Sequence, residues 1–442
     1  MHRALEGAAG KHEDVAASAG PLRESLDRLI RLGLDGLPLD RAARSLSDGE
    51  WQQLRLADRL PTDLAGSLVI ADRVLAGLDP GSVQRSLDEL ARLSDRGNSV
   101  VLVDESEPAA ERADAAIELG PGSGIDGGRV VTAPAIHHSR KSRAKPRRVE
   151  RHLRVEGLRL PTGDELSVEL KKERLVVVAG PKGAGKSTLL DFLCEEVRRR
   201  LGDEAPGGTF CELVGARTLQ HLGRLPRFLP SPQESVSWYE WAGLRGALWA
   251  LFAATPRARL QGDFQKLRTG ATAPELCPEC RGRGRVAVRL PLLPGAERTC
   301  PRCRGRRFRD SALGITVRGM TILDVLAQSA IDARDVLAHD TDVVGRLQLL
   351  EDLGVGHVPL ERLATEASSG EVRLGYLARM LHETGSPGAL LALEWPALGL
   401  DRAGGERVAA VLTRRASKGD TVLCIDTHPA LNEAADAVIR LG

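Results

Sequence analysis

Short apolar runs alternate with amphipathic segments in the first third of the chain. Residues 67–72 (SLVIAD) and 99–105 (SVVLVDE) are continuous apolar runs of the length expected for buried strands. The segment between them, GSVQRSLDELARLSDRG, has helical spacing and closes at Gly97. A strand, a helix and a second strand in this order predict a fold of the α/β class. A further helix is predicted over residues 21–34, with four apolar residues on one face: Leu22, Leu26, Leu29 and Ile30.

The second half of the chain repeats this order of elements. A Val-rich strand is predicted just before residue 180, and apolar runs at 388–395 (GALLALEW) and 420–428 (DTVLCIDTH) enclose a helical segment. Because residues 67–131 and 388–442 share the same succession, we expect an internal duplication.

Composition narrows the class of protein. The 442 residues are 42% hydrophobic and 28% charged, as in an ordinary globular protein with two or three domains. A formal net charge of +2 excludes a whole-molecule polyelectrolyte, so any nucleic-acid surface must be a local patch. The amino-terminal sequence has no apolar signal segment, and the longest apolar helical stretch, 246–255, is too short to span a bilayer. These features predict a cytoplasmic protein without a membrane segment.

Four of the seven cysteines form two close pairs with the spacing of a metal site. CPECRGRGR (277–285) and CPRCRGRRF (300–308) give the pattern C-x2-C-x19-C-x2-C. Four thiolates at this spacing fit one tetrahedral Zn²⁺; the alternative is two buried pairs of unligated thiols. The predicted zinc ligands are Cys277, Cys280, Cys300 and Cys303. Arginines crowd the same segment and either contact phosphates or only keep a small module soluble: Arg281, Arg283, Arg285, Arg302 and Arg304.

The sequence GPKGAGKS at 180–187 follows the Val-rich strand and precedes an apolar helical segment. It fits the G-x-x-x-x-G-K-[ST] pattern of a phosphate-binding loop, in which glycines let backbone N–H groups surround phosphates. Lys186 is expected to reach the β- and γ-phosphates of ATP, and Ser187 to ligate Mg²⁺. An ordinary Gly-rich turn is the alternative. The candidate nucleotide-binding residues here are Gly180, Gly183, Gly185, Lys186, Ser187 and Thr188.

A third motif, Ser47, Gly49 and Glu50, precedes a helix predicted to begin near Trp51. Backbone N–H groups at the start of a helix can bind a γ-phosphate presented by another domain. The same string is also an ordinary helix N-cap. Its distance ahead of the strand at 67–72 favours the phosphate-binding interpretation.

Together these motifs resemble the UvrA family of DNA-damage-recognising ABC ATPases, which carry two ATPase heads in one chain. LSDGEWQQLRLA (46–57) is similar to the family signature, and GPGSGIDGGRV (120–130) to its Gly-rich segment. ASSGEVRLGYLARML (367–381) resembles an eroded second signature. The four-Cys module and GITVRGMTILDVLAQSA also match, so that the resemblance covers roughly residues 22–442.

The resemblance implies an α/β fold with ABC-type P-loop ATPase heads, one partial and one nearly complete, and an inserted four-Cys zinc module. Residues 1–132 correspond to the carboxy-terminal half of the first head, and 133–154 to a basic linker that is either a solvated connector or touches phosphates. Residues 155–442 correspond to the second head, with the zinc insertion at about 265–312. In the family each nucleotide lies between one head's phosphate loop and the other head's signature. One composite site is therefore expected here, because the first head's own phosphate loop has no counterpart.

Within that composite site the hydrolytic residues depart from the family pattern. Glu394 stands at the magnesium-binding aspartate position, and Trp395 at the position of the glutamate that polarises water. Arg73 replaces the same glutamate in the first head, and His428 lies next to the switch-histidine position. Glu394 and His428 are the remaining catalytic candidates. Loss of a general base typically costs 10²–10⁴ in rate, so slow or absent hydrolysis is expected, with ATP, Mg²⁺ and Zn²⁺ as cofactors.

The leading hypothesis is a UvrA-like, zinc-containing ATP-binding protein that binds DNA without sequence specificity in connection with nucleotide excision repair. Two alternatives stay open: a nucleotide-gated interaction module without DNA binding, and an active ATPase subunit of the excinuclease. The expected partners are DNA and either a second copy of this chain or a full-length UvrA. Docking of UvrB is doubtful, because the region that docks it has no counterpart in the sequence.

Overall fold

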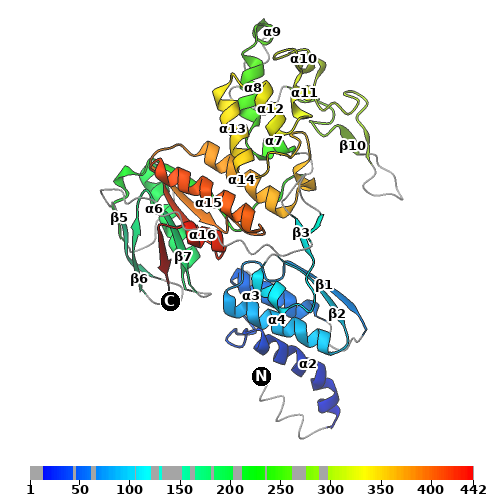
Figure 1. Cartoon of the computed structure of the whole chain (residues 1–442), viewed down its shortest axis with the longest axis vertical. Coiled ribbons are helices and arrows are strands. Elements are labelled where there is room, and N and C mark those ends of the chain that lie inside the picture. Colours follow the sequence, from blue (N-terminus) through cyan, green and yellow to red (C-terminus); the bar gives the residue numbers. More distant parts are fainter. Residues whose placement is uncertain are drawn as a thin grey trace.

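The computed structural model describes residues 13–42, 46–60, 66–104, 106–120, 129–131, 152–159, 165–180, 184–202, 212–233, 236–260, 275–287 and 297–441. Figure 1 shows two bodies: a smaller one in blue and cyan, and a larger one that holds the remaining elements. We call residues 13–131 the first lobe and residues 152–441 the second lobe. The predicted linker falls almost wholly outside the described residues, although strand β5 begins inside it, at His152.

A parallel sheet of five strands, in the order β14-β7-β13-β12-β9, forms the centre of the second lobe. Its strands are β7 (Leu175–Ala179), β9 (His221–Leu225), β12 (Ala389–Glu394), β13 (Thr421–Ile425) and β14 (Ala437–Arg440). Alternate residues of β12 pack on opposite faces: Leu390 belongs to the same core as helix α6 (Lys186–Leu201), and Leu391 to the core of the helical elements. Both faces are covered, which is why the central strands are continuously apolar.

An antiparallel sheet lies on the α6 side of this lobe. It has the order β6-β5-β8, formed by β5 (His152–Arg159), β6 (Glu165–Lys171) and β8 (Glu212–Val214). Leu153 and Val155 of β5 are fully buried in the core that also contains Leu189 and Leu193 of α6. The sheet therefore helps to hold the start of α6 in place.

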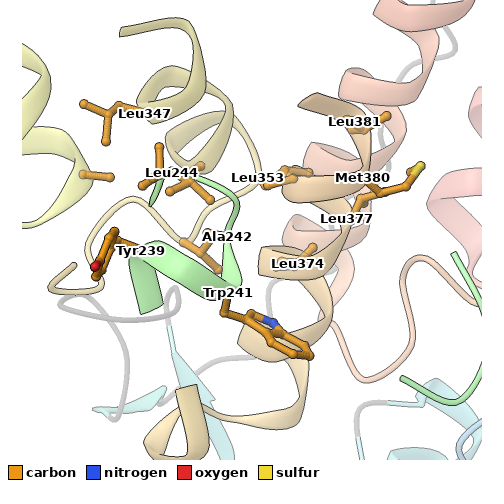
Figure 2. Close-up of a cluster of buried hydrophobic side chains, with 14 of the residues drawn as sticks. Tyr239, Trp241, Ala242, Leu244, Leu347, Leu353, Leu374, Leu377, Met380 and Leu381 are labelled. Carbon is orange, nitrogen blue, oxygen red and sulfur yellow. The ribbon is translucent and has the colours of Figure 1, made fainter. Parts of the chain in front are cut away.

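Helices cover the opposite face of the parallel sheet and extend away from it (Figure 1). They are α7 (Trp238–Trp241), α8 (Arg245–Ala253), α9 (Pro256–Leu260), α10 (Asp310–Leu313), α11 (Ile322–Leu326), α12 (Ala330–Val336), α13 (Thr341–Asp352), α14 (Ser369–Glu383), α15 (Arg402–Ser417) and α16 (Pro429–Ala434). Figure 2 shows Trp241 and Ala242 next to Leu374 and Leu377 of α14, within one continuous core. None of the described helices is both long and apolar enough to cross a membrane.

The first lobe repeats the strand–helix–strand unit of the second. Its elements are α2 (Glu13–Arg31), α3 (Asp48–Arg59), β1 (Leu68–Asp72), α4 (Pro80–Asp95), β2 (Ser99–Val103), α5 (Glu107–Arg112), β3 (Glu118–Gly120) and β4 (Arg129–Val131). β1 and β2 are parallel, as β12 and β13 are. Gly97 follows α4 with a φ of 85°, a left-handed conformation that glycine adopts without strain.

One expectation about these strands is wrong. β1 and β2 are not buried: Leu68 is 63% exposed and Ile70 is 67% exposed, and Val101 and Val103 are also exposed. Within the described part of the chain the two strands form a sheet of their own. Their inward residues pack with α2, α3 and α4, around Leu32, Leu56 and Leu90. The continuous apolar pattern is that of a strand covered on both faces, and here only one face is covered.

The predicted face of the first helix also differs. Leu22 and Ile30 are 44% and 46% exposed, whereas Arg28 is buried. The Arg28 guanidinium donates hydrogen bonds of 2.9 Å and 2.7 Å to the carbonyl oxygens of Ala57 and Leu60 at the end of α3. A charged side chain therefore occupies the inner face because it caps the neighbouring helix.

Candidate nucleotide site and metal centre

The candidate phosphate loop joins β7 to α6. Lys186, the first residue of α6, donates a 2.7 Å hydrogen bond from Nζ to the carbonyl oxygen of Gly180. A Cβ on Gly180 would collide with the carbonyl oxygen of Leu441, and Gly185 has a φ of 82°, so both positions require glycine. Gly183 lies outside the described residues. The strand and the helix are in the predicted order, and the Lys186 side chain folds back to Gly180.

Charges around Lys186 come from both lobes. Burial lowers the pKa of Lys186, and the nearby Arg227 lowers it further, whereas Asp79 in the first lobe raises it. Ser187 is exposed and Thr188 is half-buried in the first turn of α6. The amino terminus of this 16-residue helix therefore carries a partly desolvated cation, which favours an anionic ligand.

Glu394, the magnesium candidate, ends strand β12 and is buried. Its Oε2 accepts a 3.1 Å hydrogen bond from the backbone N–H of Arg227 and lies 3.4 Å from the Arg224 guanidinium. The same guanidinium lies 2.7 Å from Asp191 on α6. Arg224 thus bridges two carboxylates. Glu394 would have to exchange Arg224 for a metal ion in order to ligate Mg²⁺.

Trp395 follows Glu394 in a left-handed conformation, with a φ of 53° and a side chain only 7% exposed. Its backbone N–H donates a 2.7 Å hydrogen bond to the carbonyl oxygen of Ile425. Its carbonyl oxygen accepts a 2.5 Å hydrogen bond from Nε of Arg373, a buried residue of α14 whose pKa burial lowers to about 10. The indole ring lies 5.1 Å from the guanidinium carbon of Arg227. The backbone on both sides of this ring is fixed.

The first lobe reproduces this arrangement at Arg73. Arg73 has a φ of 51°, and its backbone N–H donates a 2.8 Å hydrogen bond to the carbonyl oxygen of Val103. Its carbonyl oxygen accepts a 3.0 Å hydrogen bond from Gln52 of α3, as the Trp395 carbonyl accepts one from Arg373. A non-glycine residue at positive φ is uncommon. Its occurrence at both positions supports the internal duplication.

Ser47 and Glu50 form a capping box at the start of α3, which begins at Asp48 rather than near Trp51. The Ser47 N–H donates to the Glu50 carboxylate at 2.6 Å, and the Glu50 N–H donates to Ser47 Oγ at 3.4 Å. Gly49 is buried between them. Ser368 and Glu371 form the same box at the start of α14. The N-cap interpretation of the motif is therefore observed, and a phosphate-binding role stays a prediction.

The two lobes meet through the loop after β1. The Arg73 guanidinium donates a hydrogen bond to Oγ of Ser369, at the start of α14. A Cβ on Gly77 would lie 3.2 Å from the Arg227 guanidinium and 3.9 Å from Leu398. The described contacts of Ser47 and Glu50 stay within the first lobe, so the structure joins the lobes at residues 73–79 and leaves the pairing of 46–50 with the phosphate loop as a prediction.

His428, the second catalytic candidate, caps α16. Its Nδ1 accepts a 3.2 Å hydrogen bond from the N–H of Ala430, and its ring packs so closely on Gly405 that a Cβ there would collide with it. The neighbouring Asp426 is buried and accepts hydrogen bonds from the backbone N–H groups of Ala397 and His428. Burial raises the pKa of Asp426. Asp426 thus binds backbone N–H groups that follow both β12 and β13, and His428 binds one at the start of α16.

The four predicted zinc ligands come together as one buried cluster. The sulfur atoms of Cys277, Cys280, Cys300 and Cys303 all lie within 4.8 Å of one another. Two of these separations are 3.9 Å and 3.6 Å. Tetrahedral Zn²⁺ with Zn–S bonds of about 2.3 Å requires sulfurs about 3.8 Å apart. The donor set and its spacing therefore fit zinc.

Each cysteine pair is followed by the same backbone turn. Arg281 and Arg304 both have a φ of 51°, and each donates its N–H to the carbonyl oxygen of the first cysteine of its pair at 2.8 Å. The cysteine module is joined to α8 by an ion pair. The buried carboxylate of Glu275 lies 2.5 Å from the Arg245 guanidinium of α8. We call these two turns, at Cys277–Arg281 and Cys300–Arg304, the knuckles. Exposed arginines surround them: Arg281, Arg283, Arg285, Arg298, Arg302, Arg304, Arg306 and Arg309. They give this end of the molecule a local positive surface.

Sequence reasoning missed three arginines that lie at the candidate nucleotide site: Arg224, Arg227 and Arg373. The first two lie in the segment GRLPR, at the end of a strand. A charged residue at the carboxyl end of a parallel strand is a recognisable signal, because ligands of open α/β sheets bind there. Arg373 gives no such signal, since it sits in a helix between apolar residues.

The similar proteins found by sequence comparison share one name, UvrABC system protein A. No protein-family model matches the chain. The chain is 31% identical to UvrABC system protein A of Thermus thermophilus over 452 residues, which cover 95% of the chain and 47% of the relative. It is 30% identical to UvrABC system protein A of Escherichia coli K12 over 465 residues, covering 98% of the chain and 49% of the relative. The chain thus spans about half the length of these relatives.

Solved structures agree. UvrA2 from Deinococcus radiodurans superposes with a TM-score of 0.79 at 29% identity, over 97% of this chain and 54% of the other. A structure of ribosome-bound archaeal Pelota and ABCE1 matches 92% of this chain and 55% of the other, with a TM-score of 0.50 at 16% identity, which supports the fold alone. The predicted α/β class, with ABC ATPase neighbours and an inserted four-cysteine module, is confirmed. Sequence and structure together show that this chain belongs to the UvrA family, within the ABC ATPase superfamily.

Proposed function

We propose that this protein binds MgATP between its two lobes and holds it as a clamp, hydrolysing it slowly or not at all. We further propose that it binds DNA through its zinc module, in a role related to nucleotide excision repair. The observation that carries the first part is Trp395. A buried indole stands at the end of β12, where an ATPase needs a proton acceptor, and an indole accepts no proton from water.

Binding depends on other groups. Lys186, the backbone around Gly185 and the amino terminus of α6 supply positive charge and N–H donors for phosphates. Ser187 and Glu394 are the proposed magnesium ligands. The carboxylate that completes the family pattern is thus retained, although it is one methylene longer than an aspartate.

The second wall of the site is the start of α3 in this proposal, with Ser47, Gly49 and Glu50 facing the nucleotide. Support comes from the junction of the lobes, since Asp79 acts electrostatically on Lys186 and Gly77 packs close to Arg227. A ligand held by both lobes favours their closed arrangement by mass action. At a concentration 100 times its Kd this amounts to about 2.7 kcal/mol.

DNA binding rests on the arginine-rich surface of the zinc module. Zn²⁺ bound by the four cysteines would fix the two knuckles and so hold the neighbouring arginines in place. Arginine recognises phosphates through a rigid fork of N–H donors. Contacts of this kind go to the backbone and carry no sequence information, so the proposed binding is non-specific and falls with salt.

The proposal is tested by two equilibrium titrations on purified, zinc-loaded protein. The first measures MgATP binding by the wild type, by Lys186→Ala and by a control, Lys418→Ala, which removes an exposed lysine of the same lobe. We expect affinity to fall at least about 10-fold for Lys186→Ala only. The second measures binding of duplex DNA against salt concentration, with and without ATP.

The outcomes separate the alternatives. No DNA affinity at low salt, with or without ATP, would remove the DNA-binding role and favour a nucleotide-gated interaction module. Such a module would bind a protein partner, a second copy or a full-length UvrA, without a steep dependence on salt. Turnover of ATP at ordinary rates would favour an active ATPase subunit of the excinuclease.

A further inference from the structure

Arg227 occupies the point where the two lobes and the candidate nucleotide site meet. It lies two residues beyond β9, and its backbone is fixed on both sides. Its N–H donates a 3.1 Å hydrogen bond to Glu394, and its carbonyl oxygen accepts a 2.9 Å hydrogen bond from Arg373. The path of the chain here is therefore set by groups from β12 and from α14.

The side chain of Arg227 reaches towards the first lobe. Its guanidinium carbon lies 5.1 Å from the centre of the Trp395 ring and 5.8 Å from that of Phe228. One guanidinium nitrogen lies 3.2 Å from the position of a Cβ on Gly77, which has a φ of 74°. Guanidinium groups are attracted to aromatic faces within about 6 Å. Trp395 thus acts as a platform that holds this cation against the loop of the first lobe.

Arg227 also shares its surroundings with Lys186. Both cations are partly withdrawn from water, and the charge of Arg227 makes protonation of Lys186 less favourable. Asp79 of the first lobe has the opposite and larger effect on Lys186. An anionic ligand placed between Lys186 and Arg227 would be attracted by both cations. The anion for which the loop of Lys186 is built is a phosphate.

We propose that Arg227 recognises the terminal phosphate of bound ATP. Trp395 positions the Arg227 guanidinium, and the contact with Gly77 couples the position of Arg227 to the first lobe. This inference rests on the proposed function of the site. In this proposal Trp395 stands at the position that activates water in an ATPase and instead holds the Arg227 guanidinium in place. ATP and ADP then differ in whether Arg227 is engaged, so Arg227 sets the preference for ATP.

The test measures Kd for MgATP and MgADP separately. A charge-assisted hydrogen bond contributes about 1.5–3 kcal/mol. Arg227→Gln is therefore expected to weaken MgATP roughly 10- to 150-fold and to change MgADP less than about threefold. Arg227→Lys keeps the charge without the fork and is expected to lie between. The matched control is Arg217→Gln, which removes an exposed arginine near the same sheet.

Variants of the platform provide an independent arm, should Arg227→Gln fold poorly. Trp395→Phe keeps an aromatic face and is expected to keep the preference for ATP. Trp395→Leu removes that face and should reduce the ratio of the ADP Kd to the ATP Kd about threefold or more. The thermal unfolding midpoint of each variant confirms that it is folded.

Two kinds of failure can be told apart. If the wild type binds neither nucleotide, both the proposed function and this inference are wrong. If the wild type binds both, and Arg227→Gln weakens MgATP and MgADP equally or leaves both unchanged, only the role of Arg227 is overturned. Arg227 would in that case be a structural contact of the lobe junction. A selective loss of ATP affinity supports the inference.

Discussion

The guanidinium of Arg73 donates a hydrogen bond to the hydroxyl of Ser369, linking the end of β1 to the start of α14 across 296 positions of the sequence. On the resemblance to the family signature, Arg73 is expected at the position of the water-polarising glutamate, and Ser369 lies in the second signature-like motif. The Arg73 side chain of the first lobe therefore contacts the second lobe.

Removal of this contact should loosen the junction without unfolding either lobe. Arg73→Ala is expected to lower the free energy of unfolding by less than about 1 kcal/mol, since the pair is exposed. Amide hydrogen exchange at the start of α14 should nevertheless accelerate. Arg59→Ala, on the exposed end of α3, is the control. Unchanged exchange in Arg73→Ala would show that the contact does not hold the lobes.

The uneven covering of the two duplicated sheets gives a matched pair of mutations. Leu68 begins β1 and is 63% exposed, whereas Leu390, at the corresponding place in β12, is fully buried. Leu390→Ala is expected to cost about 2–5 kcal/mol, because it leaves a cavity. Leu68→Ala should cost less than about 1 kcal/mol. Chemical denaturation compares them, and a large loss for Leu68→Ala would mean that the outer face of β1 is covered in solution.

Sequence patterns succeeded where the determinants are local. The order of strand, loop and helix around Lys186 depends on adjacent residues, and the cysteine cluster depends on two short knuckles with fixed spacing. The start of α3 was displaced by a few residues because Glu50 serves as a cap instead of preceding the helix.

Burial was harder to predict because it depends on elements distant in the chain. The apolar run at Leu68–Asp72 is compatible with covering on either one face or two. Arg28 is buried because the end of α3 presents carbonyl oxygens to it. Arg227 and Arg373 are 146 positions apart, and no local pattern indicates that they meet.

Acid should destabilise the protein through His382. Burial lowers the pKa of His382 to about 4, and Arg346 adds to this effect. Its folded pKa thus lies below the ordinary histidine pKa of 6.5, so the unfolded state binds the proton more readily. Its contribution is complete above pH 6.5 and is lost as pH falls towards about 4.

The loss should be about 2 kcal/mol between pH 7 and pH 5. His382→Gln removes the titrating group and should flatten this part of the profile, as followed by urea unfolding midpoints. An equally steep decline in that variant would assign the acid sensitivity to other groups. Glu371, whose pKa a hydrogen bond from His357 lowers to about 2, loses its contribution at lower pH, between about 4.5 and 2.

Zinc should be required by the knuckle module and not by the phosphate loop. Cys277→Ser is expected to reduce bound zinc severalfold or more and to expose residues 275–309 to protease, because ligand loss removes binding energy that also folds the module. Cys194→Ser alters a buried cysteine of α6 outside the cluster and should retain zinc. Metal content by atomic absorption decides the matter; full zinc in Cys277→Ser would contradict the four-cysteine assignment.

The central claim, that ATP is held without being hydrolysed because Trp395 offers no base, is tested most directly by single-turnover hydrolysis of bound MgATP. The wild type is compared with Trp395→Glu and with Trp395→Gln, which is similar in size but has no carboxylate. We expect negligible turnover in the wild type and in Trp395→Gln, and a rate about 10²-fold or more higher in Trp395→Glu. Rapid hydrolysis by the wild type, or equal rates in all three proteins, would contradict the claim.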